Sequence, residues 1–290
     1  MMTNYRIVAR AERDVLGEGP HWSVRSGTLF WVDIVGQRLW SLTLADDRLR
    51  SWAMPEKICW VVEQAGSADL LAGFKSGVAD VSLDPFVIRP RLSPEPARPH
   101  NRLNDAKVDP TGRLWFGSKD DRDQEASGAL YSLDSSGRVR RHDDGYQVTN
   151  GPAFSPEGDW LYHTDSGRGL VYRFPLGADG MLGERSIFIQ FEQGWGAPDG
   201  MTTDAEGYLW IAHWGGGRVS RFDPNGQLDR SIALPATNIT SCTFAGPRLD
   251  RMFVTSASLK TDGGEMQGVL FEIEPGVTGL APIAFAGRAL

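Results

Sequence analysis

The sequence has few of the residues that mark several common protein classes. Only two cysteines, Cys59 and Cys242, occur among 290 residues, and they form no Cys-x-x-Cys pair. The sequence therefore argues against a disulfide scaffold and against a zinc site built from thiolates. No stretch approaches 18 consecutive apolar residues, and the N-terminal segment has no apolar run of signal-peptide length. We therefore expect a reduced, soluble, cytoplasmic protein with no membrane contact.

An excess of positive charge is also missing. The chain has 30 basic and 37 acidic residues, a formal net charge of −7, and no block of lysine and arginine. Because nucleic-acid-binding proteins carry basic patches that contact phosphates, we expect no nucleic-acid partner. The sequence also contains no Gly-x-Ser-x-Gly elbow, no P-loop and no closely spaced histidine pair. The hydrolase, nucleotide-binding and zinc classes that depend on these motifs are therefore not supported.

What the sequence does contain is a repeat. Short apolar segments begin 41 to 48 residues apart, at Leu29, Leu70, Leu114, Leu161, Leu209 and Met252. Several follow four-residue segments that begin with Asp or Ser and end with Gly, namely 109–112, 155–158 and 204–207. Such segments form type I turns between hairpin strands. A period of 40–50 residues with several strands per unit is typical of propeller blades.

Six such units predict an all-β protein, a six-bladed β-propeller with four-stranded antiparallel blades around a central channel. We expect residues 1–290 to form a single domain, as a monomer or weak homo-oligomer. The ring must also close. Residues 5–10 read as an alternating strand and are expected to supply the outer strand of the last blade, with 282–286 as the alternative donor.

The repeat predicts which side chains meet in the channel. Positions ten or eleven residues before the leading residue of each unit start the innermost strands; they are Glu18, Cys59 or Trp60, Asn104, Asn150, Asp199, and Ser241 or Cys242. Two converging carboxylates repel each other unless a cation compensates them. Carboxylate and amide oxygens favour hard divalent cations. Glu18, Asn150 and Asp199 would leave coordination positions open for water and substrate, as metal-assisted hydrolysis requires. Asp or Asn before Gly also forms ordinary turns; the shared register is what favours a site.

Several segments form recognisable motifs, among them Gly17-Glu-Gly-Pro-His-Trp22, Asn101-Arg-Leu-Asn-Asp-Ala-Lys-Val-Asp-Pro110, Thr149-Asn-Gly151 and Pro198-Asp-Gly-Met201. Together they resemble one family, that of senescence marker protein (regucalcin), gluconolactonase and luciferin-regenerating enzyme. His163-Thr-Asp165 and Trp214-Gly-Gly216 are most similar to bacterial sugar-acid lactonases. One departure is Ala106, where the family pattern has glycine.

The resemblance implies a six-bladed propeller with one catalytic divalent cation at one end of the channel, held by Glu18, Asn150 and Asp199. It implies that Arg102 and Asn104 bind the substrate, with Asn104 near the metal. It also implies that an acidic residue of the loop after Lys119 lies over the sugar. Asp120 and Asp121 are the alternatives for that residue.

These expectations combine into a functional hypothesis. We expect metal-dependent hydrolysis of a small-molecule sugar lactone to its aldonic acid, with Asp199 as the general base. The cation is left open among Ca²⁺, Mg²⁺, Mn²⁺, Zn²⁺ and Fe²⁺. Two other readings are an esterase that acts on a non-sugar ester or phosphotriester, and a non-catalytic propeller that binds a cation.

Overall fold

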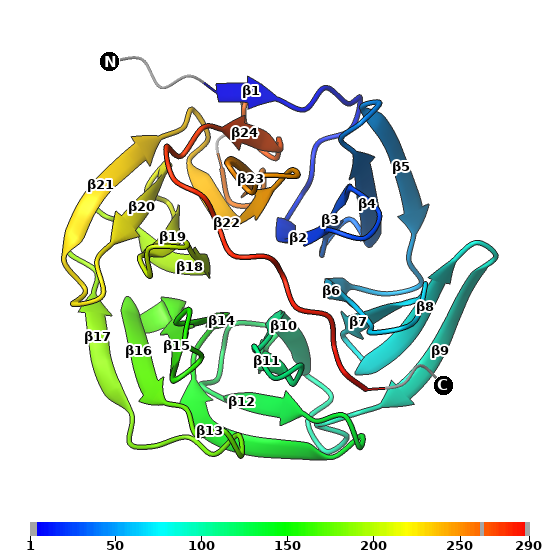
Figure 1. Cartoon of the computed structure of the whole chain (residues 1–290), viewed down its shortest axis with the longest axis vertical. Helices are drawn as coiled ribbons and strands as arrows, with labels where there is room; N and C mark the ends of the chain where they lie inside the picture. Colours follow the sequence, from blue (N-terminus) through cyan, green and yellow to red (C-terminus); the bar gives the residue numbers. More distant parts are fainter. Residues whose placement is uncertain (1–4, 262–263, 288–290) are drawn as a thin grey trace.

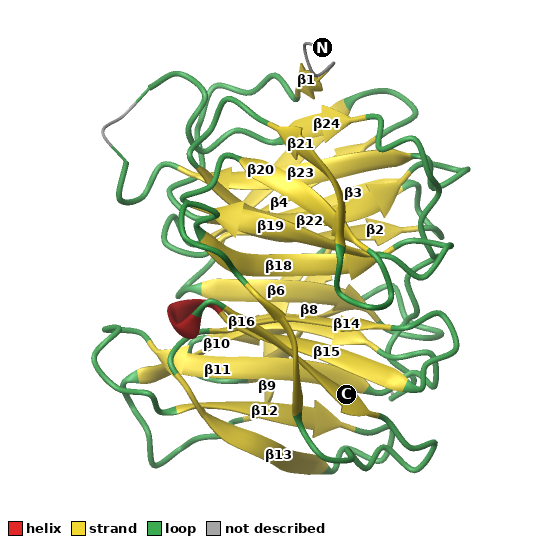
Figure 2. Ribbon diagram, turned by 90° about the vertical axis from the view of Figure 1, so that its left-hand side faces the viewer, coloured by secondary structure: helices red, strands yellow, loops and turns green. Residues whose placement is uncertain are grey.

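The strands of the protein form a closed ring. The computed structural model describes residues 5–261 and 264–287 and contains six four-stranded sheets. Each sheet is antiparallel, and the six surround a central channel (Figure 1). Seen from the side, the loops collect at the two ends of the strands (Figure 2). The predicted six-bladed β-propeller is thus confirmed.

The blades follow one another along the chain, and each begins with its innermost strand. The first three blades consist of β2 (Gly17–Ser23), β3 (Thr28–Asp33), β4 (Arg38–Thr43) and β5 (Arg48–Ala53); β6 (Ile58–Glu63), β7 (Leu70–Phe74), β8 (Val78–Leu83) and β9 (Phe86–Leu92); and β10 (Asn101–Val108), β11 (Leu114–Asp120), β12 (Gly128–Leu133) and β13 (Val139–Tyr146). The fourth and fifth consist of β14 (Thr149–Phe154), β15 (Trp160–Asp165), β16 (Leu170–Pro175) and β17 (Ser186–Gln190); and β18 (Ala197–Thr203), β19 (Leu209–Trp214), β20 (Arg218–Phe222) and β21 (Leu228–Ala233). The sixth consists of β22 (Asn238–Ala245), β23 (Arg251–Ala257), β24 (Phe271–Ile273) and β1 (Tyr5–Ile7). One 3₁₀-helix, η1 (Ser166–Arg168), follows β15. Over the described ranges, no helix has the length and apolar character needed to cross a membrane.

The N-terminal strand sits in the last blade. β1 pairs antiparallel with β24, with Arg6 opposite Glu272, and forms the outer edge of the sixth sheet. The other candidate for this place, residues 282–286, instead belongs to a C-terminal segment (276–287) that crosses one end of the channel (Figure 1). Because strands from both ends of the chain build one blade, we propose that the chain folds as a single domain.

The repeated turns and tryptophans support each other. Asp109 begins the 109–112 turn, and its Oδ1 accepts the backbone N–H of Thr111 at 2.9 Å. Its other oxygen accepts the indole N–H of the fully buried Trp115 at 2.8 Å. Asp204 and Trp210 repeat this arrangement two blades later, at 2.9 Å. A buried indole needs such an acceptor, so the recurring Asp and Trp tie each turn to the packing between blades.

The C-terminal segment is anchored by one buried aromatic side chain. Phe285 is 1% exposed, its N–H donates to the carbonyl of Glu63 at 2.8 Å, and Arg91 lies over its ring. We expect Phe285→Ala to lower the free energy of unfolding by about 3–5 kcal/mol, because it opens a cavity in a packed site. Ile283→Ala in the same segment, where the side chain is 41% exposed, should change it by less than about 0.5 kcal/mol. Urea denaturation of both variants tests this; equal stabilities would show that the segment is not anchored at Phe285.

Candidate functional site

β-Bulges near the start of the innermost strands orient the side chains of the predicted site residues. The pairing of the innermost strand with its neighbour shifts register after Glu18, after Leu103, after Asn150 and after Pro198. Bulges of this kind bend a strand and redirect its side chains, often next to active sites. The second and sixth blades carry the same irregularity, at Cys59 and Thr240. In the sixth blade the bulged residue therefore precedes the predicted Ser241 or Cys242.

Glycines make this arrangement possible. Gly19 and Gly151 follow Glu18 and Asn150 and have φ angles of +53° and +71°, a region that glycine enters without steric strain. Gly200 serves a different purpose, because a Cβ there would lie 2.2 Å from the Ser241 hydroxyl oxygen. The glycines that follow the site residues in the sequence thus have specific structural causes.

A cavity of about 640 Å³ opens at the mouth where the innermost strands begin. Six of the predicted residues line it, namely Glu18, Arg102, Asn104, Asp121, Asn150 and Asp199. Glu18, Asn150 and Asp199 are only 4–6% exposed. Residues 18, 102–104, 150 and 199 are far apart in the sequence, and the ring brings them to one end of the channel.

The two carboxylates at this mouth are buried, and negative charges near them disfavour their ionised forms. Burial, and then the charge of Asp199, raise the pKa of Glu18 well above its usual value. Burial, and then the charge of Asp105, do the same to the pKa of Asp199. Oδ1 of Asp199 is buried and has no hydrogen-bond partner within the described part of the chain. Buried carboxylate oxygens are normally partnered, so this atom is ready to accept a proton or bind a cation.

The residues present fit a hard divalent cation. Two buried carboxylates and the Asn150 amide offer three oxygen donors, the type that Ca²⁺, Mg²⁺ and Mn²⁺ prefer. Across residues 5–261 and 264–287, no three His, Cys, Asp or Glu side chains group around a common metal position. Among the predicted residues, the third oxygen donor at this mouth is the amide of Asn150.

A chain of hydrogen bonds fixes the amides beside the carboxylates. Arg102 donates from Nη1 to Oδ1 of Asn104. Asn104 donates from Nδ2 to Oδ1 of Asn150 at 2.8 Å, and Asn150 donates from Nδ2 to the Ser166 hydroxyl at 2.9 Å. The bonds to Arg102 and Ser166 determine how both amides are turned. In this arrangement Asn104 touches the proposed ligand Asn150 directly.

The structure separates the two acidic alternatives of the loop after β11. Asp121 lines the cavity and accepts hydrogen bonds from Arg102 Nε at 3.1 Å and Lys57 Nζ at 2.7 Å. Although burial opposes it, these cations hold the pKa of Asp121 below its ordinary value. Asp120 is buried beneath the loop, where its carboxylate accepts the backbone N–H groups of Gln124 and Glu125 at 3.1 Å. Of the two alternatives only Asp121 lines the cavity, and its contact with a substrate stays a prediction.

Sequence reasoning missed five charged residues that line the same cavity: Lys57, Lys119, Asp123, Glu125 and Lys260. Lys119 ends the strand β11 together with Asp120, and Asp123 and Glu125 belong to the acidic loop that follows, so the sequence around the predicted acids already contained these three residues. Lys57 and Lys260 lie just outside β6 and β23, and no motif marks them.

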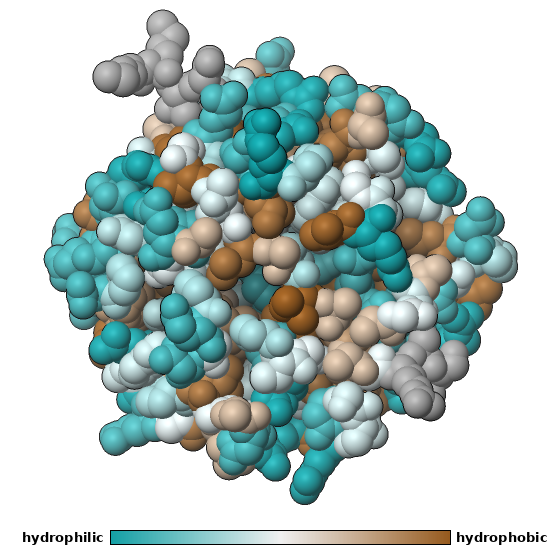
Figure 3. All heavy atoms as spheres, viewed as in Figure 1, coloured by the Kyte–Doolittle hydropathy of each residue, from teal (hydrophilic) through white to brown (hydrophobic). Residues whose placement is uncertain are grey.

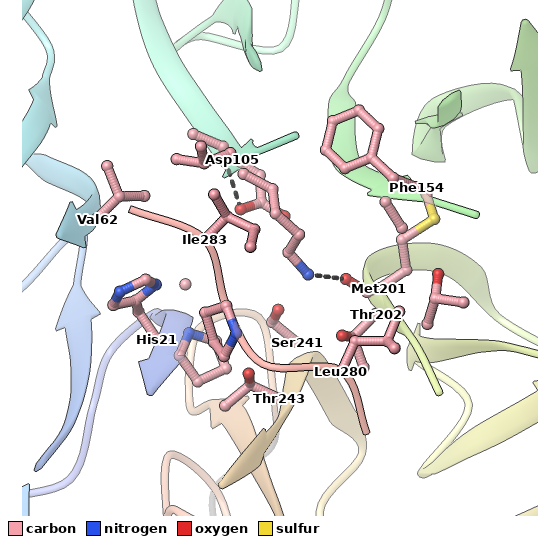
Figure 4. Close-up of a pocket in the computed structure, with 18 of the residues that line it drawn as sticks. His21, Val62, Asp105, Phe154, Met201, Thr202, Ser241, Thr243, Leu280 and Ile283 are labelled. Atoms are coloured by element: carbon pink, nitrogen blue, oxygen red, sulfur yellow. Dashed lines mark hydrogen bonds between the residues drawn. The ribbon is translucent and has the colours of Figure 1, made fainter. Parts of the chain in front are cut away.

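A second cavity, of about 240 Å³, lies at the opposite end of the channel beneath the C-terminal segment (Figure 4). Figure 4 shows His21, Ser241 and Ile283 around it, and Lys107 donates to the carbonyl of Met201 at 2.7 Å. Burial lowers the pKa of His21 to about 4, so His21 is neutral near pH 7. Apolar side chains gather near the centre of this face (Figure 3). With a single carboxylate, that of Asp105, among its lining residues, this end lacks the paired acids of the other mouth.

Comparisons with known proteins agree with each other. A model of the SMP-30/Gluconolactonase/LRE-like region matches residues 16–258. A 6-deoxy-6-sulfogluconolactonase from Pseudomonas putida is 35% identical over 282 residues, which cover 94% of this chain and 96% of that protein. Among solved structures, a luciferin-regenerating enzyme superposes with a TM-score of 0.93 at 27% identity, covering 98% of this chain and 99% of the other. A calcium-binding protein, regucalcin, from Agrobacterium tumefaciens superposes with a TM-score of 0.92 at 29% identity, covering 98% and 97%.

Proposed function

Because the chain belongs to the SMP-30/gluconolactonase/LRE-like family, as its motifs led us to expect, we propose that it hydrolyses a sugar lactone to the aldonic acid with the help of a divalent cation. The partner-free Oδ1 of Asp199 carries this proposal. It lies in a cavity of about 640 Å³, beside a second buried carboxylate and fixed amides. The relative from Pseudomonas putida is named for a lactone of the same chemical type, which supports an aldonolactone as the substrate.

Glu18, Asn150 and Asp199 are the residues that would hold the cation. When bound, the cation supplies Lewis-acid polarisation of the lactone carbonyl and compensates the negative charge that develops on its oxygen. The regucalcin from Agrobacterium tumefaciens is described as calcium-binding, which makes Ca²⁺ the first ion to test. Mg²⁺, Mn²⁺, Zn²⁺ and Fe²⁺ are the others.

Asp199 acts as the general base in this proposal. Its Oδ1 accepts a proton from the water whose oxygen attacks the lactone carbonyl carbon. The bond between that carbon and the ring oxygen then breaks, and the same carboxyl returns the proton to the departing alkoxide, which stays part of the open-chain acid. Water is consumed, and Asp199 ends the cycle ionised.

Arg102 and Asn104 position the lactone. The hydrogen bonds found for Arg102 use Nε and Nη1, so within the described residues its Nη2 amino group keeps its donors for the lactone oxygens. Asp121 anchors the guanidinium through Nε at 3.1 Å. An anchored guanidinium loses little freedom on binding, which is how a positioning group lowers a barrier.

A panel of aldonolactones tests the proposal. The protein is treated with a chelator and reconstituted with one divalent ion at a time. The opening of the lactone ring is then measured by the acid that it releases. We expect hydrolysis to stop on chelation and to return with the correct ion. Faster turnover of an aryl ester or phosphotriester than of every lactone would favour the esterase reading instead. Cation binding without hydrolysis of any ester would favour the non-catalytic reading.

A further inference from the structure

Two cations face each other on adjacent strands at the mouth of the candidate site. Arg102 on β10 lies directly opposite Lys119 on β11 in the sheet register. Both side chains are buried, at 7% and 8% exposed. Like charges in directly opposed positions destabilise a sheet. Burial, and then the charge of Arg102, lower the pKa of Lys119. The fold thus holds two positive charges together in a place where neither is well solvated.

The ion pairs around these two side chains join several cations to each carboxylate. Three cations converge on Asp121, namely Lys57 at 2.7 Å, Arg102 at 3.1 Å and Lys75 at 3.3 Å. Lys119 and Lys260 both pair with Asp123, Lys260 at 3.4 Å. Five cations therefore share two carboxylates, in a chain whose formal net charge is −7.

The rest of the same loop reduces the excess without removing it. Arg122 pairs with Asp120 and Glu125, so the whole charged set contains six cations and four carboxylates. Lys75 and Arg122 are not among the residues that line the cavity. Its charged lining consists of four cations and five carboxylates: Lys57, Arg102, Lys119 and Lys260, and Glu18, Asp121, Asp123, Glu125 and Asp199. The proposed divalent cation would neutralise Glu18 and Asp199, which leaves four cations and three carboxylates around the reacting carbonyl.

Hydroxyl groups of a neutral sugar do not require such an excess. A neutral hydroxyl can be bound equally well by uncharged amides or paired ions, whereas hydrogen bonds from cations to an anion are shorter and about twice as strong. A lysine ammonium has three N–H donors, and Lys119 uses one of them on Asp123. Lys119 lines the same cavity as Asp199, so its remaining donors are available at the end where the lactone would bind.

We propose that the preferred lactone of this site is anionic, carrying a carboxylate, sulfonate or phosphate group away from the lactone carbonyl, and that Lys119 with Lys57 binds this group. The inference rests on the proposed lactone hydrolysis and adds the charge of the substrate to it. The buried and directly opposed Arg102 and Lys119, which both line the cavity, are the observation that carries it.

The test compares lactones with the same ring and stereochemistry that differ only at the terminal carbon. One arm has a neutral hydroxymethyl group, and the others have a carboxylate, a sulfonate or a phosphate there. We expect kcat/KM to be about 10- to 100-fold higher for at least one anionic lactone, as expected for charge-assisted hydrogen bonds. The anionic arm with the highest value identifies the group. Raising the ionic strength should reduce this ratio, because salt screens the lysines.

Variants then locate the effect. Lys119→Gln should bring the ratio of anionic to neutral kcat/KM close to one, and Lys119→Arg should keep most of it. Arg48→Gln is the matched control; it removes one positive charge from the outer strand β5, where the side chain is 61% exposed, and should leave the ratio unchanged. If Lys119→Gln does not fold, the double variant Lys57→Gln, Lys260→Gln replaces it, with the same expected direction.

The outcomes separate the two proposals. No hydrolysis of any lactone by the cation-loaded protein overturns the proposed function. Hydrolysis of the neutral lactone with an equal or higher kcat/KM than every anionic one overturns only the anionic preference. An equal loss on both lactones in Lys119→Gln also overturns it, because Lys119 would then act only by compensating Glu18 and Asp199.

Discussion

Asp199→Asn reduces kcat on the best lactone by about 10²–10⁴-fold, the usual contribution of a general base, and at the same time stabilises the metal-free protein. The first effect follows because an amide cannot accept the proton of the attacking water. The second follows because the substitution removes a buried carboxylate whose pKa is raised by burial and by the charge of Asp105, and whose own charge raises the pKa of Glu18. Steady-state kinetics with the cation present and thermal denaturation with a chelator measure the two effects.

A turn aspartate provides the control. Asp223 is an acid of the same type in the turn between β20 and β21, where its Oδ1 accepts the N–H of Asn225 at 2.9 Å. Asp223→Asn should leave kcat within about twofold, since it touches nothing near the cavity. Wild-type turnover by the metal-loaded Asp199 variant would remove Asp199 from the mechanism. Opposite signs for activity and stability are typical of residues that a fold keeps for function.

The second large effect concerns the stability of the metal-free protein as the pH changes. The pKa values of Glu18 and Asp199 are raised in the folded state, so the folded protein holds more protons than the unfolded chain. The stability that these groups contribute is complete below their unfolded pKa values of about 4 and is lost as the pH rises through the folded values. Adding the cation should therefore raise Tm more at pH 8 than at pH 5. With the ion at about 100 times its Kd, the gain at pH 8 is about 2.7 kcal/mol, or roughly 5–10 °C.

Buried histidines act in the opposite direction and have to be separated from this effect. Burial lowers the pKa of His21 and His142 to about 4 and that of His163 to about 3, so these groups remove stability as the pH falls below about 6.5. The difference between wild type and Glu18→Gln cancels them. In the presence of chelator, the advantage of the variant should grow from pH 5 to pH 8. A constant difference would mean that the two carboxylates do not repel each other in the folded protein.

Much of the propeller fold could be predicted because each blade repeats the same sequence pattern. The apolar segments recur at the spacing of one blade. A strand that is hard to assign in one blade can therefore be assigned from its equivalents in the other five. The same repetition predicted that Glu18, Asn150 and Asp199 start equivalent strands. It did not predict the bulges at these positions, because a bulge depends on how two strands pair and leaves only the following glycine in the sequence.

The remaining site residues depend on contacts that no single repeat contains. Asp120 is the last residue of β11 and Asp121 is the first residue of the following turn, and the sequence does not say which of the two faces the channel. The structure does, because Lys57 and Arg102 from two other strands or loops meet Asp121. Lys260, which follows β23 of the sixth blade, lines the same cavity and pairs with Asp123. Contacts between residues this far apart in the sequence form because the ring is closed.

The C-terminal segment crosses the far end of the channel, away from Glu18 and Asp199 (Figure 1). If the site hydrolyses an anionic lactone as proposed, substrate and acid both pass the mouth that Lys119 and Lys57 line. Ring opening creates a new carboxylate, so the acid carries one more negative charge than the lactone and binds these lysines more strongly. The release of the acid is then the step that the same lysines slow.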